Sequence, residues 1–313
     1  MFSNFIVSVE AVVPMFLIMG VGALIKKIGM IDPDEQKRFN RIVFVCCFPC
    51  MMFDNLYGKN IGDAINLKLI AYAVGMFLVL YCLTVVTVLK IEKDQKARGA
   101  MIQAIYRSNF VIMGIPVVQN IFGRGDLAMT AVVVTVVVPI YNILAVVTLE
   151  VFRGSRPDFK EILLNILKNP IIVGAMAGVV TIILHITLPN FIVNPIKLLG
   201  DAATPMTLLL LGASFDFSSV KSEKRNLIIC VTGRLIVYPL IGLAGAVMMG
   251  FRDVALLTLV AMFAAPSAVT SYTMAQQMDS DYELAGNCVI FSSLFSCFTM
   301  FLWIFILKSM GMF

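Results

Sequence analysis

Ten apolar runs, each about as long as a membrane-crossing helix, follow one another along this chain with only short polar connections between them. A transmembrane helix needs roughly 17 to 25 mostly apolar residues. The composition agrees, because 60% of the 313 residues are hydrophobic and only 14% are charged, whereas charged residues make up about 25% of a typical soluble domain. The sequence therefore predicts an all-α polytopic membrane protein with ten spans, at Phe5 to Leu24, Ile42 to Leu56, Leu67 to Leu89, Ala100 to Phe122, Leu127 to Val151, Ile162 to Leu188, Phe191 to Phe215, Leu227 to Met249, Val254 to Ala275 and Leu284 to Leu307.

The lysines and arginines indicate how these spans are oriented. When the connections are assigned alternately to two sides, sixteen of the 24 basic residues fall on one side and six on the other. By the positive-inside rule, the richer side is cytoplasmic, so both termini face outward. The first run carries Glu10 and is followed by its basic pair, the reverse of a cleavable signal peptide, so we expect it to remain as a span. The net charge of +5 is then a topology signal and indicates no nucleic-acid partner.

Proline spacing indicates an internal repeat. Two proline pairs are separated by 156 residues and a third by 150, both close to half the chain length; the pairs are Pro14 with Pro170, Pro49 with Pro205, and Pro116 with Pro266. Five spans per half would place the second half upside down relative to the first, which is the inverted repeat of many carriers. We therefore expect one five-helix repeat at residues 1–152 and a second at residues 162–313, joined by a charged loop.

Two spans contain an interruption that an unbroken helix would avoid. The stretch RSNFVIMGIPVVQ begins at Arg107, and FAAPSAVTSYTMAQ begins at Phe263; both place a proline and small polar residues within an apolar segment. Backbone groups freed in hydrocarbon are tolerated only when they are buried in protein or line a cavity, so paired broken helices predict a binding site near the membrane midplane. If the helices unwind just before Pro116 and Pro266, two helix N-termini would favour an anion there.

Arg107 is the first candidate to bind that anion, by bidentate pairing with a carboxylate. The alternative is that its side chain reaches back to the cytoplasmic interface, which is the reading we favour for Arg234 in the eighth span. Tyr141 and Asn142 follow Pro139 in the fifth span and could border the same cavity. The predicted substrate-binding set is Arg107, Ser108, Asn109, Gly114, Pro116, Pro266, Ser267, Thr270, Ser271, Tyr141 and Asn142.

Energy coupling has three readings from the sequence. Buried acids can carry protons, and Asp201, near the middle of the seventh span, is the first candidate for this role, with Asp54 second. Asp201 could instead be a structural cap. Sodium is the second reading, since Gln119, Gln276 and unwound carbonyls could supply oxygen ligands. A facilitated uniport, the third reading, needs neither ion, and we expect no bound cofactor or metal.

Several motifs resemble the auxin efflux carrier family over essentially the whole chain. Asn109 with Gly114, Ile115 and Pro116 is similar to its Asn, Gly-x-Pro pattern, and further similar stretches are Asn169-Pro170 followed by IIVGAMAG, Thr204-Pro205 followed by MTLLLLGASF, and APSAVTSYTMAQQMDSDYELAG from Ala265 to Gly286. Two positions differ, with Val111 where many members have glycine and Thr270 where many have asparagine. The short central loop is similar to that of bacterial members, which implies a bacterial inner membrane.

This resemblance implies a bile-acid-symporter-like architecture in which helices 4 and 9 cross. It further implies a scaffold part at about 5–57 and 162–217, a transport part at about 66–152 and 226–309, and an elevator-type movement of one part against the other. The implied substrate is a small organic anion, auxin-like or malate-like, and a homodimer through the scaffold part is expected.

Other functions stay open at this point. A sodium-coupled symporter of the bile-acid type shares the architecture, and a receptor or channel could use the same cavity. An intramembrane enzyme is not expected, because the sequence contains no HExxH, GxGD or G-x-S-x-G motif.

Overall fold

The computed structural model describes residues 2–58, 66–122, 127–153 and 159–313, and most of these residues lie in helices. Within it the only extended pairing is a single antiparallel bridge between Ser108 and Ser267. The helices, with turns of π-helix marked η, are α1 Phe2–Lys27, α2 Pro33–Ile42, η1 Val43–Cys47, α3 Phe48–Leu56, α4 Leu67–Ile91, α5 Gln95–Tyr106, η2 Phe110–Gly114, α6 Ile115–Phe122, α7 Leu127–Val151, α8 Phe159–Lys168, α9 Pro170–Ile183, α10 Asn190–Ser214, α11 Phe217–Ser222, α12 Lys224–Thr232, η4 Gly233–Val237, α13 Tyr238–Met248, α14 Asp253–Ala264, α15 Thr270–Gln277 and α16 Tyr282–Ser309.

Six of the described helical segments are long and apolar enough to cross a membrane. They are Pro33–Leu56, Leu67–Ile91, Ala128–Val151, Asn190–Ser214, Lys224–Met248 and Tyr282–Ser309. A seventh span is obtained if Ile162–Lys168 and Pro170–Ile183 count as one, although they meet at an angle of 62°. The bend falls at Asn169, whose side chain caps α9 by accepting a hydrogen bond from the Ile171 amide at 3.0 Å. The sequence predicted one span at Ile162 to Leu188, and the structure divides that region into two helices because Pro170 begins a new helix.

The second span begins nine residues earlier than its apolar run suggests. Asp32 accepts hydrogen bonds from the amides of Asp34 and Glu35 at 2.8 and 2.7 Å, and the Glu35 carboxylate accepts one from the Asp32 amide at 2.9 Å. This capping box satisfies the free amides of the first helical turn. The helix therefore starts in polar sequence that hydropathy does not detect.

Each of the three described π-turns ends two residues before a proline. η1 precedes Pro49, η2 precedes Pro116 and η4 precedes Pro239. A proline has no amide hydrogen, and its ring would clash with the carbonyl four residues earlier. The wider π-turn contains that carbonyl in every case, and the one at Leu235 instead accepts a hydrogen bond from Trp303 Nε1 at 3.0 Å. Widening the helix thus lets these prolines stay inside a continuous span.

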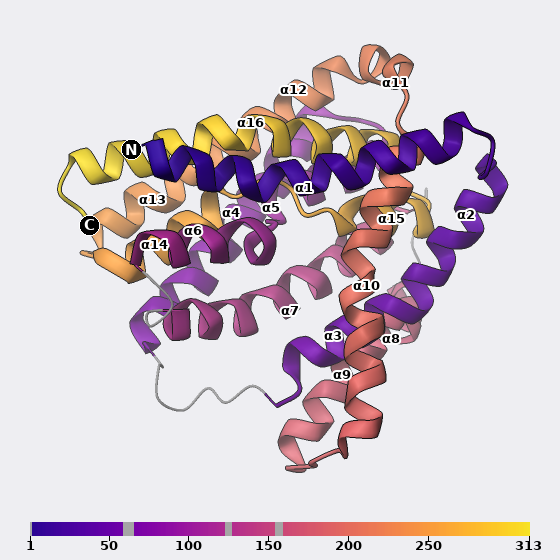
Figure 1. Ribbon diagram of the computed structural model, residues 1–313, viewed down its shortest axis with the longest axis horizontal. Coiled ribbons are helices and arrows are strands. Elements are labelled where there is room, and N and C mark those ends of the chain that lie inside the picture. Colours follow the sequence, from indigo (N-terminus) through magenta and orange to yellow (C-terminus); the bar gives the residue numbers. More distant parts are fainter. Residues whose placement is uncertain (1, 59–65, 123–126, 154–158) are drawn as a thin grey trace.

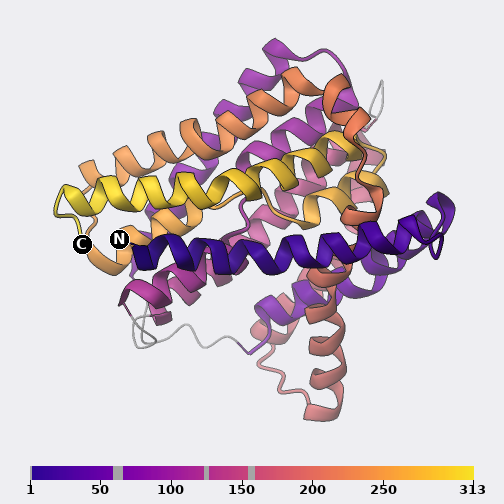
Figure 2. The ribbon, with the colours of Figure 1, turned by 45° about the horizontal axis from the view of Figure 1, so that its top comes forward.

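In Figures 1 and 2, α3, α9 and α10 extend away from the remaining helices, whereas α1 lies beside α16 and crosses α10. α3 packs against α9 and α10. The close approach of α1 and α10 depends on glycine, because a Cβ atom at Gly22 would lie 1.9 Å from the Leu209 carbonyl oxygen, and one at Gly212 would lie 2.0 Å from that of Met19. The start of α1 and the C-terminus of the chain lie on the same side in both views.

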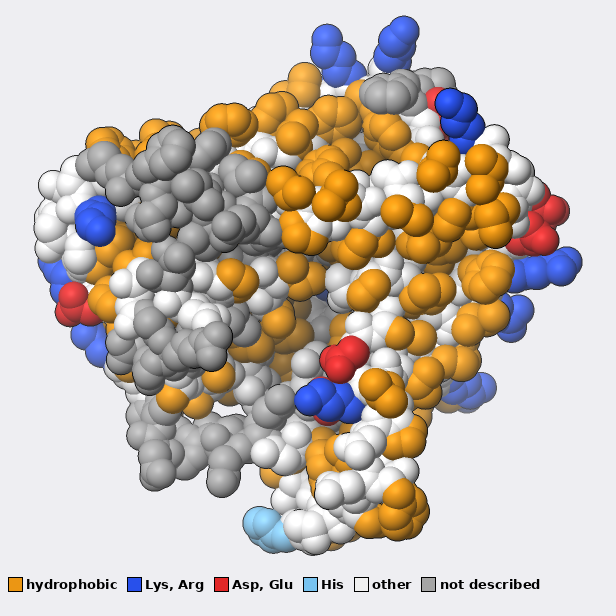
Figure 3. Space-filling view, in the orientation of Figure 1, with side chains coloured by type: hydrophobic (Ala, Val, Ile, Leu, Met, Phe, Trp, Pro, Cys, Tyr) orange, Lys and Arg blue, Asp and Glu red, His pale blue; other side chains and the backbone are white. Residues whose placement is uncertain are grey.

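The surface matches a helix assembly surrounded by lipid. Apolar side chains cover much of the face in Figure 3, and most of the charged side chains visible there lie towards its edges. Many large hydrophobic residues on α4, α9, α10 and α16 are exposed. In water such a surface would be costly, whereas in hydrocarbon it is the expected exterior.

Candidate functional site

The two interrupted helices cross where both lose helical structure. α5 ends at Tyr106 and the chain resumes as η2 at Phe110, while α14 ends at Ala264 and α15 begins at Thr270. The two breaks are joined by backbone hydrogen bonds, from Asn109 N to Pro266 O at 2.8 Å and from Ala268 N to Arg107 O at 3.0 Å. Backbone groups that each helix loses are therefore partly satisfied by the other.

The breaks do not fall where the prolines predicted them. The first break lies at residues 107–109, seven residues before Pro116, because η2 absorbs the effect of that proline. In the second, Pro266 lies inside the break, and α15 starts four residues later. The expectation that each proline opens the second half-helix is thus wrong at both positions.

Arg107 is buried at the crossing, with 2% of its surface exposed. Its Nη1 donates to Gln103 Oε1 at 3.0 Å and to Met274 Sδ at 3.0 Å, with Ser271 Oγ at 3.5 Å, and its Nη2 donates to Asn142 Oδ1. All of these acceptors are neutral, and no described carboxylate forms an ion pair with it. The side chain does not reach the interface, so a buried positive charge faces this site without a carboxylate paired to it among the described residues.

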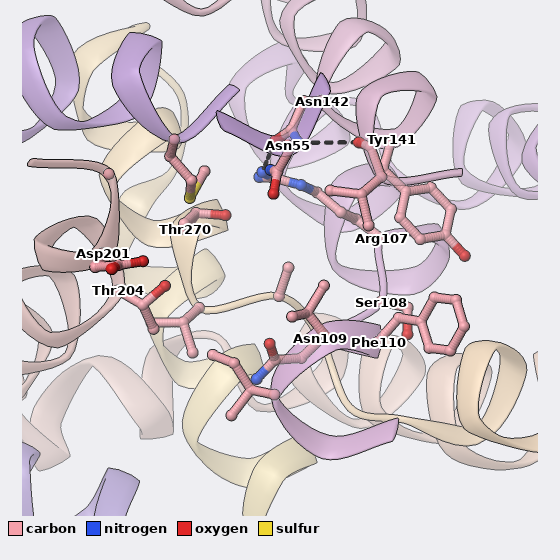
Figure 4. Close-up of a pocket in the computed structure, with 17 residues that line it drawn as sticks. Asn55, Arg107, Ser108, Asn109, Phe110, Tyr141, Asn142, Asp201, Thr204 and Thr270 are labelled. Atoms are coloured by element: carbon pink, nitrogen blue, oxygen red, sulfur yellow. Dashed lines mark hydrogen bonds between the residues drawn. The ribbon is translucent and has the colours of Figure 1, made fainter. Parts of the chain in front are cut away.

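A cavity of about 220 Å³ opens beside this arginine (Figure 4). Asp201 and Thr204 of α10 lie on one side of it, Arg107 and Asn142 lie on the other, and Asn109 lies between them. The lining residues are Met51, Asn55, Arg107, Ser108, Asn109, Phe110, Val111, Ile112, Val138, Tyr141, Asn142, Gly200, Asp201, Thr204, Ala268, Val269 and Thr270. The cavity therefore combines one buried cation, Arg107, and one acid, Asp201, with several neutral polar groups.

Polar atoms at the cavity lack partners among the described residues. The Ser108 hydroxyl and the Asn109 amide nitrogen are buried without a hydrogen bond. The Tyr141 hydroxyl is also unpaired, but it points away from Asp201 and Thr204 in Figure 4. The N-terminus of α15 also has no side-chain cap. Unsatisfied buried donors are costly, and native proteins usually satisfy them with water or a ligand. The donors favour an occupant that carries oxygen acceptors.

The predicted substrate-binding residues divide into three groups. Lining the cavity are Arg107, Ser108, Asn109, Thr270, Tyr141 and Asn142. Pro266, Ser267 and Ser271 lie at the crossing without lining the cavity: Ser267 Oγ donates to Ala104 O at 2.7 Å, and Ser271 O accepts from Gln103 Nε2 at 3.3 Å. Gly114 and Pro116 lie further along, at the junction of η2 and α6.

The coupling candidates are separated as well. Asp201 lines the cavity, but it is exposed, so the expectation of a buried acid is wrong at this position. Asp54 does not line the cavity; its neighbour Asn55 does, although hydropathy gave no signal for it. Gln119 and Gln276 lie on α6 and α15, outside the cavity lining. Gln276 instead accepts a hydrogen bond from Asn40 Nδ2. The two glutamines therefore do not supply oxygen ligands to this cavity.

Arg234 is the residue whose position differs most from the sequence expectation. Its side chain was expected to reach the interface, but it is fully buried beneath the crossing, with 0% exposure. Its guanidinium donates only to backbone carbonyls of the two interrupted helices, those of Ala265, Ile105, Tyr106, Met262 and Phe263, at 2.7 to 3.2 Å. The expectation is wrong because backbone acceptors cannot be recognised from a sequence.

A buried polar network joins α2 and α10 to α15. Asn40 accepts from the Thr273 hydroxyl at 2.6 Å, and that hydroxyl lies 3.3 Å from Thr207 Oγ1. Gln36 Nε2 donates to Tyr272 OH at 3.0 Å and to a carbonyl of α10 at 2.8 Å. These bonds hold α15, the second half of the interrupted helix α14–α15, against α2 and α10, on the side where α2 carries its lysine and arginines.

Comparison with known proteins gives one consistent result. A family model described as "Membrane transport protein" matches residues 7–304. The chain is 22% identical to an uncharacterized transporter of Methanothermobacter thermautotrophicus, over 96% of this chain and 98% of that protein. It is also 22% identical to an uncharacterized transporter of Methanocaldococcus jannaschii, over 96% of this chain and 99% of that protein.

Proposed function

Because the chain belongs to the membrane transport protein family, the family of the auxin efflux carriers, we propose that it is a secondary carrier of small organic anions. The proposed substrate binds at the helix crossing with its carboxylate on Arg107. This makes the protein a multi-pass membrane transporter and not an enzyme.

One observation carries the proposal. Arg107 is 2% exposed, lines the cavity and has only neutral partners among the described residues. A buried guanidinium without a counter-charge is costly, and a carboxylate that arrives with two oxygen acceptors relieves that cost. The uncapped N-terminus of α15 favours negative charge at the same place.

The cavity size supports a small substrate. Its volume of about 220 Å³ lies below the range of roughly 300 to 1,000 Å³ typical of sites for drug-sized ligands. Short mono- or dicarboxylates of the malate-like kind suit this volume better than a sterol acid. The polar groups opposite Arg107, from Asn109 to Thr204, would bind hydroxyl or second carboxyl groups of such a substrate.

We also propose the ten-segment architecture. The long spans, the bent pair α8–α9, α1 and the two interrupted helices make ten segments, which supports inverted repeats at residues 1–152 and 162–313. The packing of α1, α3, α9 and α10 against one another supports a scaffold of segments 1, 2, 6 and 7. The cavity lies between α10 and the crossed helices, so an elevator-type shift of segments 3–5 and 8–10 would carry the substrate across.

For coupling we propose a proton, carried by Asp201. This acid lines the same cavity as Arg107, and a negative charge at that place would repel an incoming anion. Uptake into proteoliposomes under separate pH, sodium and voltage gradients tests this. A pH-driven uptake that Asp201→Asn abolishes is expected; insensitivity to pH would remove Asp201 from this role.

The lysine- and arginine-rich connections indicate how the protein is oriented in the membrane. With the side of α2 and α8 in the cytoplasm, both termini would face outward, in agreement with their position on one side of the fold. We keep the inner membrane of a prokaryote as the proposed location. The two relatives above are archaeal, so a short central loop does not by itself indicate a bacterium. A homodimer through the scaffold stays a proposal.

The transport function is tested by counterflow. Mono- and dicarboxylates are first screened for an increase in the melting temperature of the purified protein, with the corresponding neutral amides as controls. Proteoliposomes loaded with an unlabelled hit should then accumulate the labelled hit in a saturable manner. Saturable binding without exchange would indicate a receptor, and non-saturable flux would indicate a channel; either result would overturn the proposal.

A further inference from the structure

Five backbone carbonyl oxygens converge on one buried position beneath the helix crossing. Ile105 and Tyr106 supply two of them from the end of α5, while Met262, Phe263 and Ala265 supply three from the end of α14 and the break after it. The last carbonyls of a helix have no partner within the helix and carry the negative end of its dipole. Two interrupted helices thus direct negative ends at a single point.

Arg234 fills this position with its guanidinium. Nε donates to Ala265 O at 2.7 Å, each terminal nitrogen donates to two further carbonyls, and the Tyr238 ring lies 4.9 Å from Cζ. No described carboxylate forms an ion pair with this arginine. The backbone carbonyls and the aromatic face therefore stabilise the charge.

The position of Arg234 results from local structure. It lies in the π-turn η4, which precedes Pro239, and that turn packs against both α5 and α14. In carriers built on discontinuous helices, unwound carbonyls and half-helix C-termini coordinate the coupling cation. Here the same type of ligand set is occupied by a side chain of the protein itself.

We propose that the crossing contains a cation-binding cage of five backbone carbonyls and that Arg234 is its permanent, built-in cation. The cage and the cavity suit charges of opposite sign. Arg234 neutralises the C-terminal ends of the half-helices at the cage, whereas the N-terminal ends and Arg107 remain available to an anion. If the cage is filled by Arg234, no sodium ion is needed at the crossing for transport, and this consequence rests on the function proposed above. The cage itself does not depend on that function.

The test removes the guanidinium group from the cage by mutation. Arg234→Ala is purified in detergent, and its melting temperature is measured in millimolar guanidinium chloride, with sodium, potassium and choline chloride at the same ionic strength. Guanidinium reproduces the lost group, so it should raise the melting temperature of this variant by about 2–4 °C, more than choline does. The wild type, whose cage is full, should gain nothing from guanidinium or from sodium.

Leu257→Ala serves as the matched control, because this fully buried residue also lies on α14. It should lose stability without recovering in guanidinium. The proposal is overturned if Arg234→Ala shows no specific recovery, if Leu257→Ala recovers equally, or if sodium raises the melting temperature of the wild type.

If Arg234→Ala cannot be purified, charge is tested by two longer side chains. Arg234→Lys keeps a cation that reaches fewer carbonyls, and Arg234→Met keeps length without charge. The lysine variant should give the higher melting temperature and folded yield, and equal values would overturn the proposal. A failure of carboxylate counterflow would leave all of these stability results unchanged, so the two proposals can fail separately.

Discussion

At the residue scale, the two buried arginines at the helix crossing have different kinds of partner. Arg107 donates to side chains and faces a cavity, whereas Arg234 donates only to backbone carbonyls. Both are costly inside a membrane and therefore mark functional or structural centres. The sequence offered the same two readings for each, and only the partners distinguish them.

Asn142 offers the sharpest test of the free charge on Arg107. Its Oδ1 accepts from the Arg107 guanidinium while its Nδ2 donates to Val138 O at 2.9 Å. Asn142→Asp would give Arg107 an internal carboxylate partner, which should lower the affinity for a carboxylate ligand about tenfold or more. Titration calorimetry measures the affinity.

Asn142→Ala is the control for that experiment. It removes the amide without supplying a negative charge, so it should retain more affinity than Asn142→Asp. Equal affinities in the two variants, or tighter binding in Asn142→Asp, would show that the charge on Arg107 is not what binds the ligand.

At the element scale, the fold is set by where helices are interrupted and where they touch. The sequence predicted the apolar runs and both interrupted segments, because hydropathy and proline are local signals. It misplaced the breaks, since the effect of Pro116 is absorbed by a π-turn, and it missed the polar start of α2. Asn55 was not found, because its place in the cavity depends on how α3 packs.

The α1–α10 contact predicts opposite effects at two nearby glycines. A Cβ atom at Gly22 would overlap the Leu209 carbonyl, whereas one at Gly20 would meet nothing within 4 Å. Gly22→Ala should therefore lower the free energy of unfolding by about 1–3 kcal/mol through overpacking. Gly20→Ala should be neutral or stabilising, by up to about 1 kcal/mol. Thermal unfolding in detergent compares them, and similar losses at both positions would contradict the packing described.

At the scale of the whole molecule, family membership and a multi-pass membrane protein were predicted from the sequence and are confirmed. The sequence could not predict which conformation the helices adopt relative to one another. The bonds between Asn40 and Thr273 hold the crossed helices against α2, and an alternating-access cycle would have to break them.

This network predicts how access to the cavity is controlled. In a cysteine-free background, Thr270→Cys reports access to the cavity through a membrane-impermeant thiol reagent applied from the basic side. Asn40→Ala should speed labelling about tenfold, because it removes hydrogen bonds worth roughly 1–3 kcal/mol. Arg38→Ala, an exposed change on the same helix, should leave the rate unchanged. If the network has no role in closing the cavity, the labelling rate should be the same in Thr270→Cys alone and in Thr270→Cys combined with Asn40→Ala or Arg38→Ala.

The central claim is that Arg107 binds the carboxylate of a transported anion, and counterflow in proteoliposomes measures it most directly. Arg98→Ala is the matched control, since that arginine lies on α5, the helix that ends just before Arg107, and donates to the carbonyls of Glu92 and Leu89 at 2.7 and 3.2 Å, away from the cavity. Arg107→Ala should raise the half-saturating concentration of a labelled carboxylate by tenfold or more, an effect of about 1.4 kcal/mol or larger, while Arg98→Ala exchanges as the wild type does. Unchanged uptake and affinity in Arg107→Ala would contradict the account.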